Sequence, residues 1–214
     1  MVMNIYNLLE PGSLVFDVGA NRGQKADSFL LRGHSVCCFE PLEDLAGLMK
    51  EKYENKKKAQ VFNIAVGGGK PTFFHRCVAD KLSTCSSDWM HKGRFAGKYS
   101  WGLGVEVETQ TLDSLIDFCG TPEYIKIDVE GYELEVIKGL TKKVRFISFE
   151  YTKEFFDITI ECINQLQKIG FTKFNFTVGE FEQFIFPSWK TKEVLIPFIE
   201  GMCDALIFGD IYAT

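Results

Sequence analysis

The chain of 214 residues lacks the features that mark several large classes of protein. No apolar run approaches the roughly 20 residues of a membrane-spanning helix. The first residues contain neither a basic stretch nor a small-residue cleavage site, so we expect no signal peptide. Internal repeats and low-complexity linkers are missing too. Because roughly 150 residues is a common domain size, we expect a single domain over residues 1–214.

An excess of positive charge is also absent. The chain has 24 Lys and Arg against 29 Asp and Glu, which gives a net charge of −5. A mildly acidic chain has no overall footprint for binding a polyanion. Neither nucleic acid nor an anionic membrane surface is therefore an expected partner.

The cysteines lack the spacing of a metal site or a disulfide framework. There are 7, an odd number, and no two of them form a C-x-x-C pair. Most lie among apolar neighbours, which predicts small buried hydrophobic residues. This use of cysteine favours a reducing compartment, and we expect a cytoplasmic protein.

Short β-rich runs alternate with longer helical patterns along the chain. The runs lack apolar–polar alternation, which is typical of parallel strands covered on both faces. The pattern predicts an α/β fold with a doubly wound, Rossmann-like sheet. Residues 77–103 have no clear period, and we expect a lid or insertion at the acceptor site there. The expected sheet strands cover residues 14–18, 35–39, 59–66, 124–129, 144–151, 171–178 and 203–208, with extra strands at 71–75 and 105–110.

The first expected strand leads into a glycine-containing turn, V-F-D-V-G-A-N-R-G at residues 15–23. In doubly wound folds such a turn holds a nucleotide-like ligand. Gly19 permits the tight turn and the approach of a ligand, and Gly23 permits packing of the next helix. Asp17 occupies the position of the first glycine of the dinucleotide-binding pattern G-x-G-x-x-G, and a carboxylate there repels a pyrophosphate but suits the cationic S-adenosylmethionine. The alternative is that Asp17 only caps the turn or the helix.

Two residues at later strand ends suit an adenosine group. Glu40 follows the second strand, where an acidic residue accepts hydrogen bonds from ribose hydroxyls. Asn63 lies near the end of the third strand, within reach of an adenine edge, although an Asn that simply ends a strand explains it equally well. Because S-adenosylmethionine and NAD both contain adenosine, Glu40 supports an adenosine ligand without choosing between them.

Five segments carry a family resemblance, in the order D-V-G-A-N-R-G, F-E-P, N-I-A-V-G, T-L-D-S-L and Y-I-K-I-D-V-E-G-Y-E-L-E-V-I-K-G-L. They resemble the FkbM family of S-adenosylmethionine-dependent methyltransferases, and the D-V-E-G-Y-E block is the most specific part. The resemblance implies a class I methyltransferase sheet, mostly parallel with a final antiparallel strand. It also implies O-methylation of a sugar or polyketide-type hydroxyl, with S-adenosylmethionine held by Asp17, Gly19, Ala20, Asn21, Gly23, Glu40, Asn63 and Ala65.

The catalytic groups are expected where the strand that contains Asp128 ends. The acceptor oxygen must lie about 3 Å from the methyl carbon, and a base that removes its proton contributes about 10²–10⁴-fold in rate. Asp128 and Glu130 would point the same way from a strand, and their repulsion would raise the pKa of one carboxyl. Glu150 ends the next strand and should open onto the same crevice. We predict these three as catalytic residues; the alternatives are a helix-terminal role for Glu130 and an ion pair between Glu150 and Lys153.

Other bases and a metal are weaker candidates. His75 and His91 lie at or within the irregular stretch, and either could act as a base, although a surface position is commoner for histidine. Some sugar and catechol O-methyltransferases use Mg²⁺, to which Asp128 and Glu130 could contribute. No compact set of three acids is evident in the sequence, so we predict no obligatory metal.

The leading hypothesis is an S-adenosylmethionine-dependent O-methyltransferase that acts on a small hydroxylated acceptor, a saccharide or related metabolite. An NAD-dependent sugar oxidoreductase is one rival, and Asp17 in place of a glycine argues against it. A non-catalytic module that binds the adenosyl cofactor is another, and the three intact acids argue against that. A nucleic-acid N-methyltransferase lacks support because no N-P-P-Y or D-P-P-Y segment is present. The acceptor site is expected from residues 77–103 and the phenylalanine-rich tail.

Overall fold

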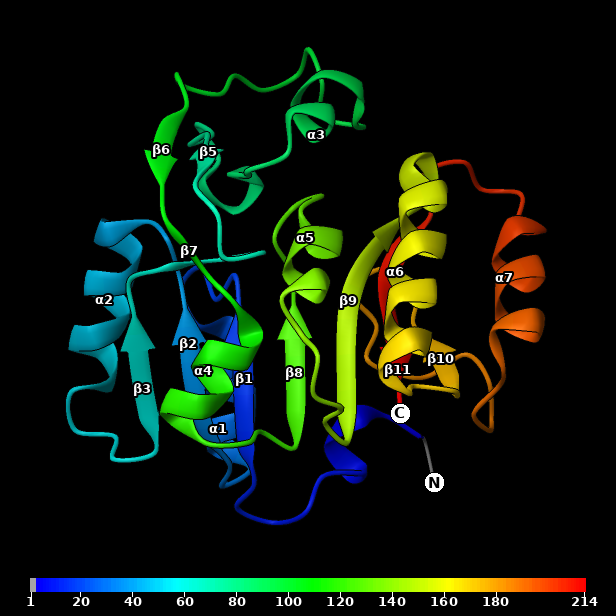
Figure 1. Ribbon diagram of the computed structural model, residues 1–214, viewed down its shortest axis with the longest axis horizontal. Coiled ribbons are helices and arrows are strands. Elements are labelled where there is room, and N and C mark those ends of the chain that lie inside the picture. Colours follow the sequence, from blue (N-terminus) through cyan, green and yellow to red (C-terminus); the bar gives the residue numbers. More distant parts are fainter. Residues whose placement is uncertain (1–2) are drawn as a thin grey trace.

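A seven-stranded sheet forms the centre of the computed structural model, which describes residues 3–214 (Figure 1). The strand order is β10-β11-β9-β8-β1-β2-β3. Only the two pairs that contain β11 are antiparallel. The predicted mostly parallel sheet with a final antiparallel strand is therefore confirmed. The strands are β1 (Leu14–Val18), β2 (Ser35–Phe39), β3 (Ala59–Phe62), β8 (Tyr124–Ile127), β9 (Phe146–Thr152), β10 (Phe174–Phe176) and β11 (Phe208–Ala213).

Helices cover both faces of this sheet. In Figure 1, α1 lies behind the sheet, whereas α4, α5 and α6 lie in front of it. Within residues 3–214, no helix combines the length and the apolar character needed to cross a membrane. The helices are α1 (Gln24–Leu31), α2 (Glu43–Tyr53), α4 (Leu112–Cys119), α5 (Glu133–Lys138), α6 (Phe156–Ile169) and α7 (Lys192–Glu200), with short 3₁₀ helices η1 (Ile5–Asn7) and η3 (Lys153–Phe155).

Successive residues of the central strands enter two different cores. In β1, Val15 packs in the core that contains α1, whereas Phe16 and Val18 pack in the core that contains α4, α5 and α6. In β8, Tyr124 and Ile125 divide in the same way. Because both faces are buried, nearly every position of these strands is apolar, which explains the absence of alternation in the sequence.

Four short strands lie outside the main sheet and divide two predicted strands. Strand β4 (Ala65–Val66) pairs with β7 (Thr109–Gln110), and β5 (Thr72–Phe74) pairs with β6 (Val105–Val107). The single strands predicted at 59–66 and 105–110 are therefore each split between two sheets. Between β5 and β6, the chain forms η2 (Asp80–Leu82) and α3 (Ser87–Lys92) above the strand tips (Figure 1).

The end of the chain differs most from expectation. The closing strand predicted at 203–208 is wrong: residues 203–206 are exposed, and β11 begins at Phe208. Gly209 and Asp210 disfavour a strand by propensity. The position between β9 and β10 nevertheless requires glycine, because a Cβ on Gly209 would lie 2.2 Å from the carbonyl oxygen of Thr177. Helix α7 was not anticipated either, and it contains Pro197.

The phenylalanine-rich tail mainly fills the core. Phe171, Phe174 and Phe176 are fully buried. The ring of Phe176 contacts that of Phe186 edge to face, with centroids 5.4 Å apart. These side chains therefore pack β10 and α7 into the core, which is the role expected for most of them.

Candidate functional site

A cleft of about 400 Å³ opens at the carboxyl ends of the parallel strands. The turn after β1, the residue after β2, the turn after β8 and the end of β9 contribute to it, together with η2 and α3. Six predicted cofactor residues line it: Asp17, Gly19, Ala20, Asn21, Glu40 and Ala65. Gly23 and Asn63 are not among its lining residues in the described chain.

The first turn packs directly against the end of β8. Gly19 has a φ of 78°, and a Cβ there would lie 1.8 Å from the carbonyl oxygen of Asp128. Gly23 has a φ of 73°, and a Cβ there would lie 2.3 Å from the hydroxyl of Tyr53. That hydroxyl donates a hydrogen bond to the Gly23 carbonyl at 2.9 Å. Because neither glycine has a side chain, the turn can pack closely against Asp128 on one side and against α2 on the other.

Asp17 lies in a buried group of charges beneath the turn. It is 1% exposed, and within residues 3–214 neither of its carboxyl oxygens has a partner at full hydrogen-bond geometry, although the backbone N–H of Ala26 in the first turn of α1 is near enough to lower its pKa. Burial raises the pKa of Asp17, and the nearby Lys126 ammonium opposes that rise. Lys126 is also buried and donates to Asp128 Oδ2 at 2.7 Å. Burial disfavours the Lys126 cation, but Asp128, Asp17 and Asp210 outweigh burial and raise its pKa. A buried carboxylate without a partner is suited to a cationic ligand.

Glu40 joins the first turn to the start of α2. Its Oε2 accepts a hydrogen bond from the Asn21 backbone N–H at 2.8 Å, and its Oε1 accepts one from Leu42 at 2.9 Å. Burial raises the pKa of Glu40 to about 7 in spite of these bonds. Each carboxylate oxygen keeps a second lone pair for a ribose hydroxyl. The Asn63 amide donates to the carbonyls of Glu40 and Pro41, so it supports this corner from outside the cleft.

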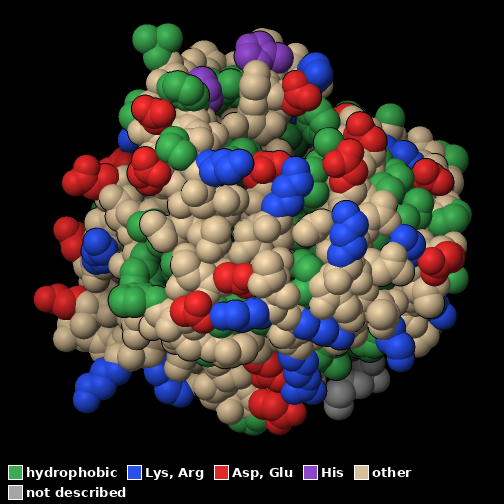
Figure 2. Space-filling view, in the orientation of Figure 1, with side chains coloured by type: hydrophobic (Ala, Val, Ile, Leu, Met, Phe, Trp, Pro, Cys, Tyr) green, Lys and Arg blue, Asp and Glu red, His purple; other side chains and the backbone are tan. Residues whose placement is uncertain are grey.

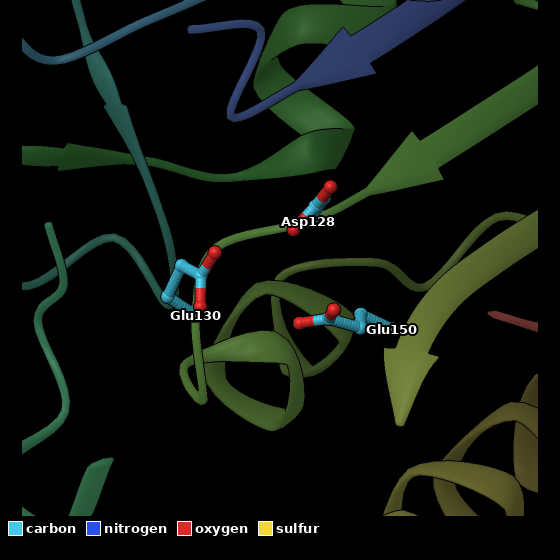
Figure 3. A group of neighbouring side chains, drawn as sticks. All are labelled: Asp128, Glu130 and Glu150. Atoms are coloured by element: carbon cyan, nitrogen blue, oxygen red, sulfur yellow. The ribbon is translucent and has the colours of Figure 1, made fainter. Parts of the chain in front are cut away.

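The side chains of Asp128, Glu130 and Glu150 converge in the cleft, as Figure 3 shows. One carboxyl oxygen from each lies within 4.8 Å of the others. Asp128 follows β8, Glu130 lies in the turn before α5, and Glu150 lies in β9. The structure thus brings all three predicted catalytic residues together. The expectation that no compact set of three acids exists is wrong, and this set offers ligand atoms that a metal ion could use.

A constrained turn, not a strand, directs Glu130 into the cleft. Strand β8 ends before Asp128, so the predicted strand geometry is wrong, and Glu130 has a φ of 56°. A non-glycine residue in this left-handed region costs roughly 1–3 kcal/mol. The turn is held by hydrogen bonds from Thr84 Oγ1 to the Glu130 carbonyl and from the N–H groups of Val129 and Gly131 to Glu133 Oε1.

The local electrostatics favour a proton on this group of acids. Burial, and then the neighbouring Asp128, raise the pKa of Glu130 and of Glu150 well above the ordinary value of 4.5. Lys126 compensates Asp128 directly through its ion pair. A carboxyl with a raised pKa can accept a proton near neutral pH more effectively than an ordinary glutamate.

The residues considered as an ion-pair partner of Glu150 or as alternative bases lie elsewhere. Lys153 does not pair with Glu150, because its ammonium donates to three carbonyls at the end of α7, those of Ile199, Glu200 and Met202. Neither His75 nor His91 lines the cleft in the described chain. His91 instead contacts the Ser87 carbonyl through Nδ1 at 2.8 Å.

Several cleft residues were missed in the sequence. Lys126 left a detectable signal, because a lysine inside an apolar strand implies a buried acidic partner. Trp89 lies in the stretch without periodicity and was not predicted. Trp89 is 3% exposed, and its Nε1–H has no hydrogen-bond partner within residues 3–214.

Ion pairs attach residues 77–103 on both sides of the cleft. On the side of β9, the Arg94 guanidinium donates to both oxygens of Glu154, at 2.6 Å and 2.5 Å. These side chains are only 12% and 19% exposed. On the side of α2, Arg76 pairs with Asp44 and Asp80 at 2.7 Å and 2.9 Å, and here Arg76 is 48% exposed. The first attachment is therefore mostly shielded from water and the second is not.

The fold is that of the class I, S-adenosylmethionine-dependent methyltransferases. Among solved structures, a candidate RNA methyltransferase of Pyrococcus horikoshii, PH1948, superposes with a TM-score of 0.53 at 11% identity, over 98% of this chain and 79% of that chain. A precorrin-6Y C5,15-methyltransferase of Geobacter metallireducens superposes with a TM-score of 0.49 at 11% identity, over 96% of this chain and 81% of that chain.

Within that class, the chain belongs to the FkbM methyltransferase family, because the methyltransferase FkbM domain matches residues 17–188. S-adenosylmethionine is the cofactor that this family and fold use. A relative, the hexuronic acid methyltransferase AglP of Haloferax volcanii, is 25% identical over 145 residues, which are 65% of this chain and 55% of the relative. The chain thus spans about half the length of this curated relative.

Proposed function

We propose that this protein transfers the methyl group of S-adenosylmethionine to a hydroxyl of a small acceptor, a saccharide or a related metabolite. The ribose would bind Glu40, and the cationic part of the cofactor would lie near Asp17. The remaining cofactor contacts would come from Gly19, Ala20, Asn21 and Ala65, with Gly23 and Asn63 supporting them from outside the cleft.

The convergence of Asp128, Glu130 and Glu150 is the observation that carries this proposal. A hydroxyl is a weak nucleophile until its proton leaves, and a nearby carboxyl with a raised pKa can take that proton. An acceptor that is already an anion needs no base, and these acids would repel it. The group therefore favours transfer to a hydroxyl. The name of the Haloferax volcanii relative supports a sugar acceptor.

The proposal extends to the organisation and surroundings of the protein. Residues 1–214 would act as one domain, with residues 77–103 as a lid over the acceptor. A cytoplasmic location is supported by the 7 cysteines, all of which are free. Acidic and basic side chains are interspersed on the face in Figure 2, which fits a small acceptor better than nucleic acid or a membrane. No obligatory metal is proposed, because Lys126 and a bound proton already offset the acidic charge.

Calorimetric titration with S-adenosylhomocysteine and, separately, with NAD tests the cofactor. We expect micromolar binding of S-adenosylhomocysteine and no measurable binding of NAD. Binding of NAD alone would overturn the proposal. Transfer of tritium from methyl-labelled S-adenosylmethionine to hydroxylated compounds then tests the reaction, and mass spectrometry of the product distinguishes a methyl ether from a methyl ester.

A further inference from the structure

A second cavity, of about 310 Å³, adjoins the cofactor cleft. It lies among α3, α5, α6 and the end of β9 (Figure 1). The boundary between them is formed by the residues that line both cavities: Cys85, Trp89, Tyr132, Glu150 and Thr152. We call the second cavity the acceptor chamber and define it by Trp89, Glu150, Phe155, Ile158 and Thr159.

We propose that the acceptor chamber binds an uncharged, hydroxylated acceptor that carries an apolar group, and that it excludes anionic acceptors. This inference rests on the proposed methyl transfer and names the chemical class of its substrate.

Glu150, at the boundary between the cleft and the chamber, defines where the reacting hydroxyl of the acceptor would lie. An acceptor held in the chamber would present its hydroxyl to Glu150, whose carboxyl also belongs to the group with Asp128 and Glu130. The acceptor O–H would lose its proton to a carboxylate of this group. The oxygen–carbon bond would form as the carbon–sulfur bond of the cofactor breaks, which leaves a methyl ether and S-adenosylhomocysteine.

The chamber contains no cation to hold an anionic acceptor. Among residues 3–214, no Lys, Arg or His lines it, whereas four acids do. Three of these acids are already compensated. Asp88 pairs with Lys92 and Glu135 pairs with Lys138. Glu133 accepts two backbone N–H bonds.

Only Glu150 is left without such compensation. Burial raises its pKa and so disfavours its charged form. An anion would find no Lys, Arg or His among the described lining residues to compensate its charge, so its transfer from water would be unfavourable. A cation would find little uncompensated negative charge to attract it.

Apolar side chains cover much of the remaining wall. Phe149, Leu134 and Ile158 line the chamber from three different elements, and Phe155 lies beside them. Burial of an apolar group against these side chains is favourable. The Trp89 indole lines the chamber at the boundary as well. The wall thus suits a molecule with one apolar end and one hydroxylated end.

The basic side chains of the neighbouring cleft do not change this conclusion. Lys126 is paired with Asp128, and Arg94 is paired with Glu154. Lys25, which pairs with Glu182, and Lys81 line the cleft but not the chamber. The acid named in the Haloferax volcanii relative is therefore not an expected occupant of this chamber.

Three matched glucosides test the inference by calorimetry on the protein saturated with S-adenosylhomocysteine. Phenyl β-D-glucopyranoside is neutral with an apolar group, phenyl β-D-glucuronide has the same group but is anionic, and methyl β-D-glucopyranoside lacks the ring. We expect the first to bind about tenfold or more tightly than either of the others. Equal or tighter binding of the glucuronide, or no binding of the neutral phenyl compound, would overturn the inference.

A filling variant locates the binding. Ile158→Trp places an indole in the chamber, whereas Ile160→Trp, on the same helix and also partly buried, does not line it. We expect Ile158→Trp to lower the affinity for the phenyl glucoside by about tenfold or more and to leave the affinity for S-adenosylhomocysteine unchanged. Ile160→Trp should keep both. Retained glucoside binding in Ile158→Trp would contradict the chamber as the site, whereas failure of the wild-type protein to bind S-adenosylhomocysteine would contradict the proposed function itself.

Discussion

The cofactor half and the acceptor half of the cleft are built in different ways. In the cofactor half, the contacts between successive strand–turn units involve the backbone: Gly19 lies against the Asp128 carbonyl, and the Glu40 carboxylate accepts the backbone N–H groups of Asn21 and Leu42. In the acceptor half, side chains from distant segments meet, as Arg94 meets Glu154. Positions in close contact with the backbone accept few residue types, so they form a motif that can be recognised in the sequence. Side-chain contacts between distant segments form no such motif.

The largest expected effect separates chemistry from cofactor binding. Asp128→Asn and Glu150→Gln keep the side-chain shape but remove a carboxylate that accepts a proton or bears charge. We expect methyl transfer to an accepted hydroxyl compound to fall by about 10²–10⁴-fold. The affinity for S-adenosylhomocysteine should stay within about twofold, since neither residue is assigned to the ribose or the turn. Initial rates and calorimetry measure the two quantities, and Glu161→Gln on the exposed side of α6 is the control.

Normal turnover in either variant would remove that residue from the catalytic group.

The reverse pattern is expected when the cofactor half is changed. Glu40→Ala removes two backbone hydrogen bonds and the proposed ribose contact. We expect S-adenosylhomocysteine to bind about 10–100-fold more weakly, since hydrogen bonds to a charged group contribute about 1.5–3 kcal/mol. The rate at saturating cofactor should change little. Glu43→Ala, at the exposed start of α2, is the matched control for the titration.

If Glu40→Ala bound the cofactor as tightly as the control, the ribose assignment would be wrong.

The two attachments of residues 77–103 should differ in strength. Arg94→Met leaves the mostly buried Glu154 without its partner, at a cost on the order of 2 kcal/mol. We therefore expect amide hydrogen exchange over residues 86–101 to become about 30-fold faster. Arg76→Met breaks two solvent-exposed ion pairs that contribute little, and Asp80 keeps its pair with Arg22, so exchange should change by less than about threefold. Equal effects from both substitutions would show that the lid is not held mainly from the side of β9.

Cofactor affinity should depend on pH through Glu40. The carboxyl has a pKa of about 7 in the free protein, and its ionised form is the better acceptor for ribose hydroxyls. Below that pH a proton must leave before the cofactor binds, so affinity should rise with pH. We expect about a tenfold gain between pH 6 and pH 8 by calorimetry. Glu40→Gln should flatten the profile, and an unchanged slope in that variant would assign the proton to another group.

Removal of metal is expected to have the smallest effect. Lys126 offsets Asp128, and the raised pKa values of Glu130 and Glu150 disfavour the charged forms of these two carboxyls. We expect methyl transfer in EDTA to stay within about twofold of the untreated rate. A loss of tenfold or more that Mg²⁺ restores would assign a metal ion to this group of acids.

Particular residues show why part of the fold was predictable. The strands expected at 14–18 and 35–39 match β1 and β2 residue for residue, because each apolar run ends at a distinct turn. The strand expected at 59–66 is interrupted where the Asn63 amide bonds to two backbone carbonyls, a contact with no local signal. The last strand contains Gly209 and Asp210, which propensity disfavours and which the neighbouring strands accept.

The residues of the site were predictable from the sequence, but their exact arrangement was not. Asp128, Glu130 and Glu150 were identified because strand ends in a parallel sheet share one edge. The closeness of their oxygens was not predictable, because it depends on the left-handed turn at Glu130 and on Thr84, which comes from a distant segment.

The sequence by itself determined the order of strand and turn units, the glycines and acids at their ends, and hence the class of cofactor. These properties are local, because each unit of strand, turn and helix carries its own pattern of apolar, small and acidic residues. Only the tertiary structure decided that Lys126 lies close to Asp17 and Asp128, and that Glu150 adjoins a chamber with no Lys, Arg or His among its lining residues within 3–214. Those features arise where segments far apart in the chain pack together, and no single segment carries the pattern of such a contact.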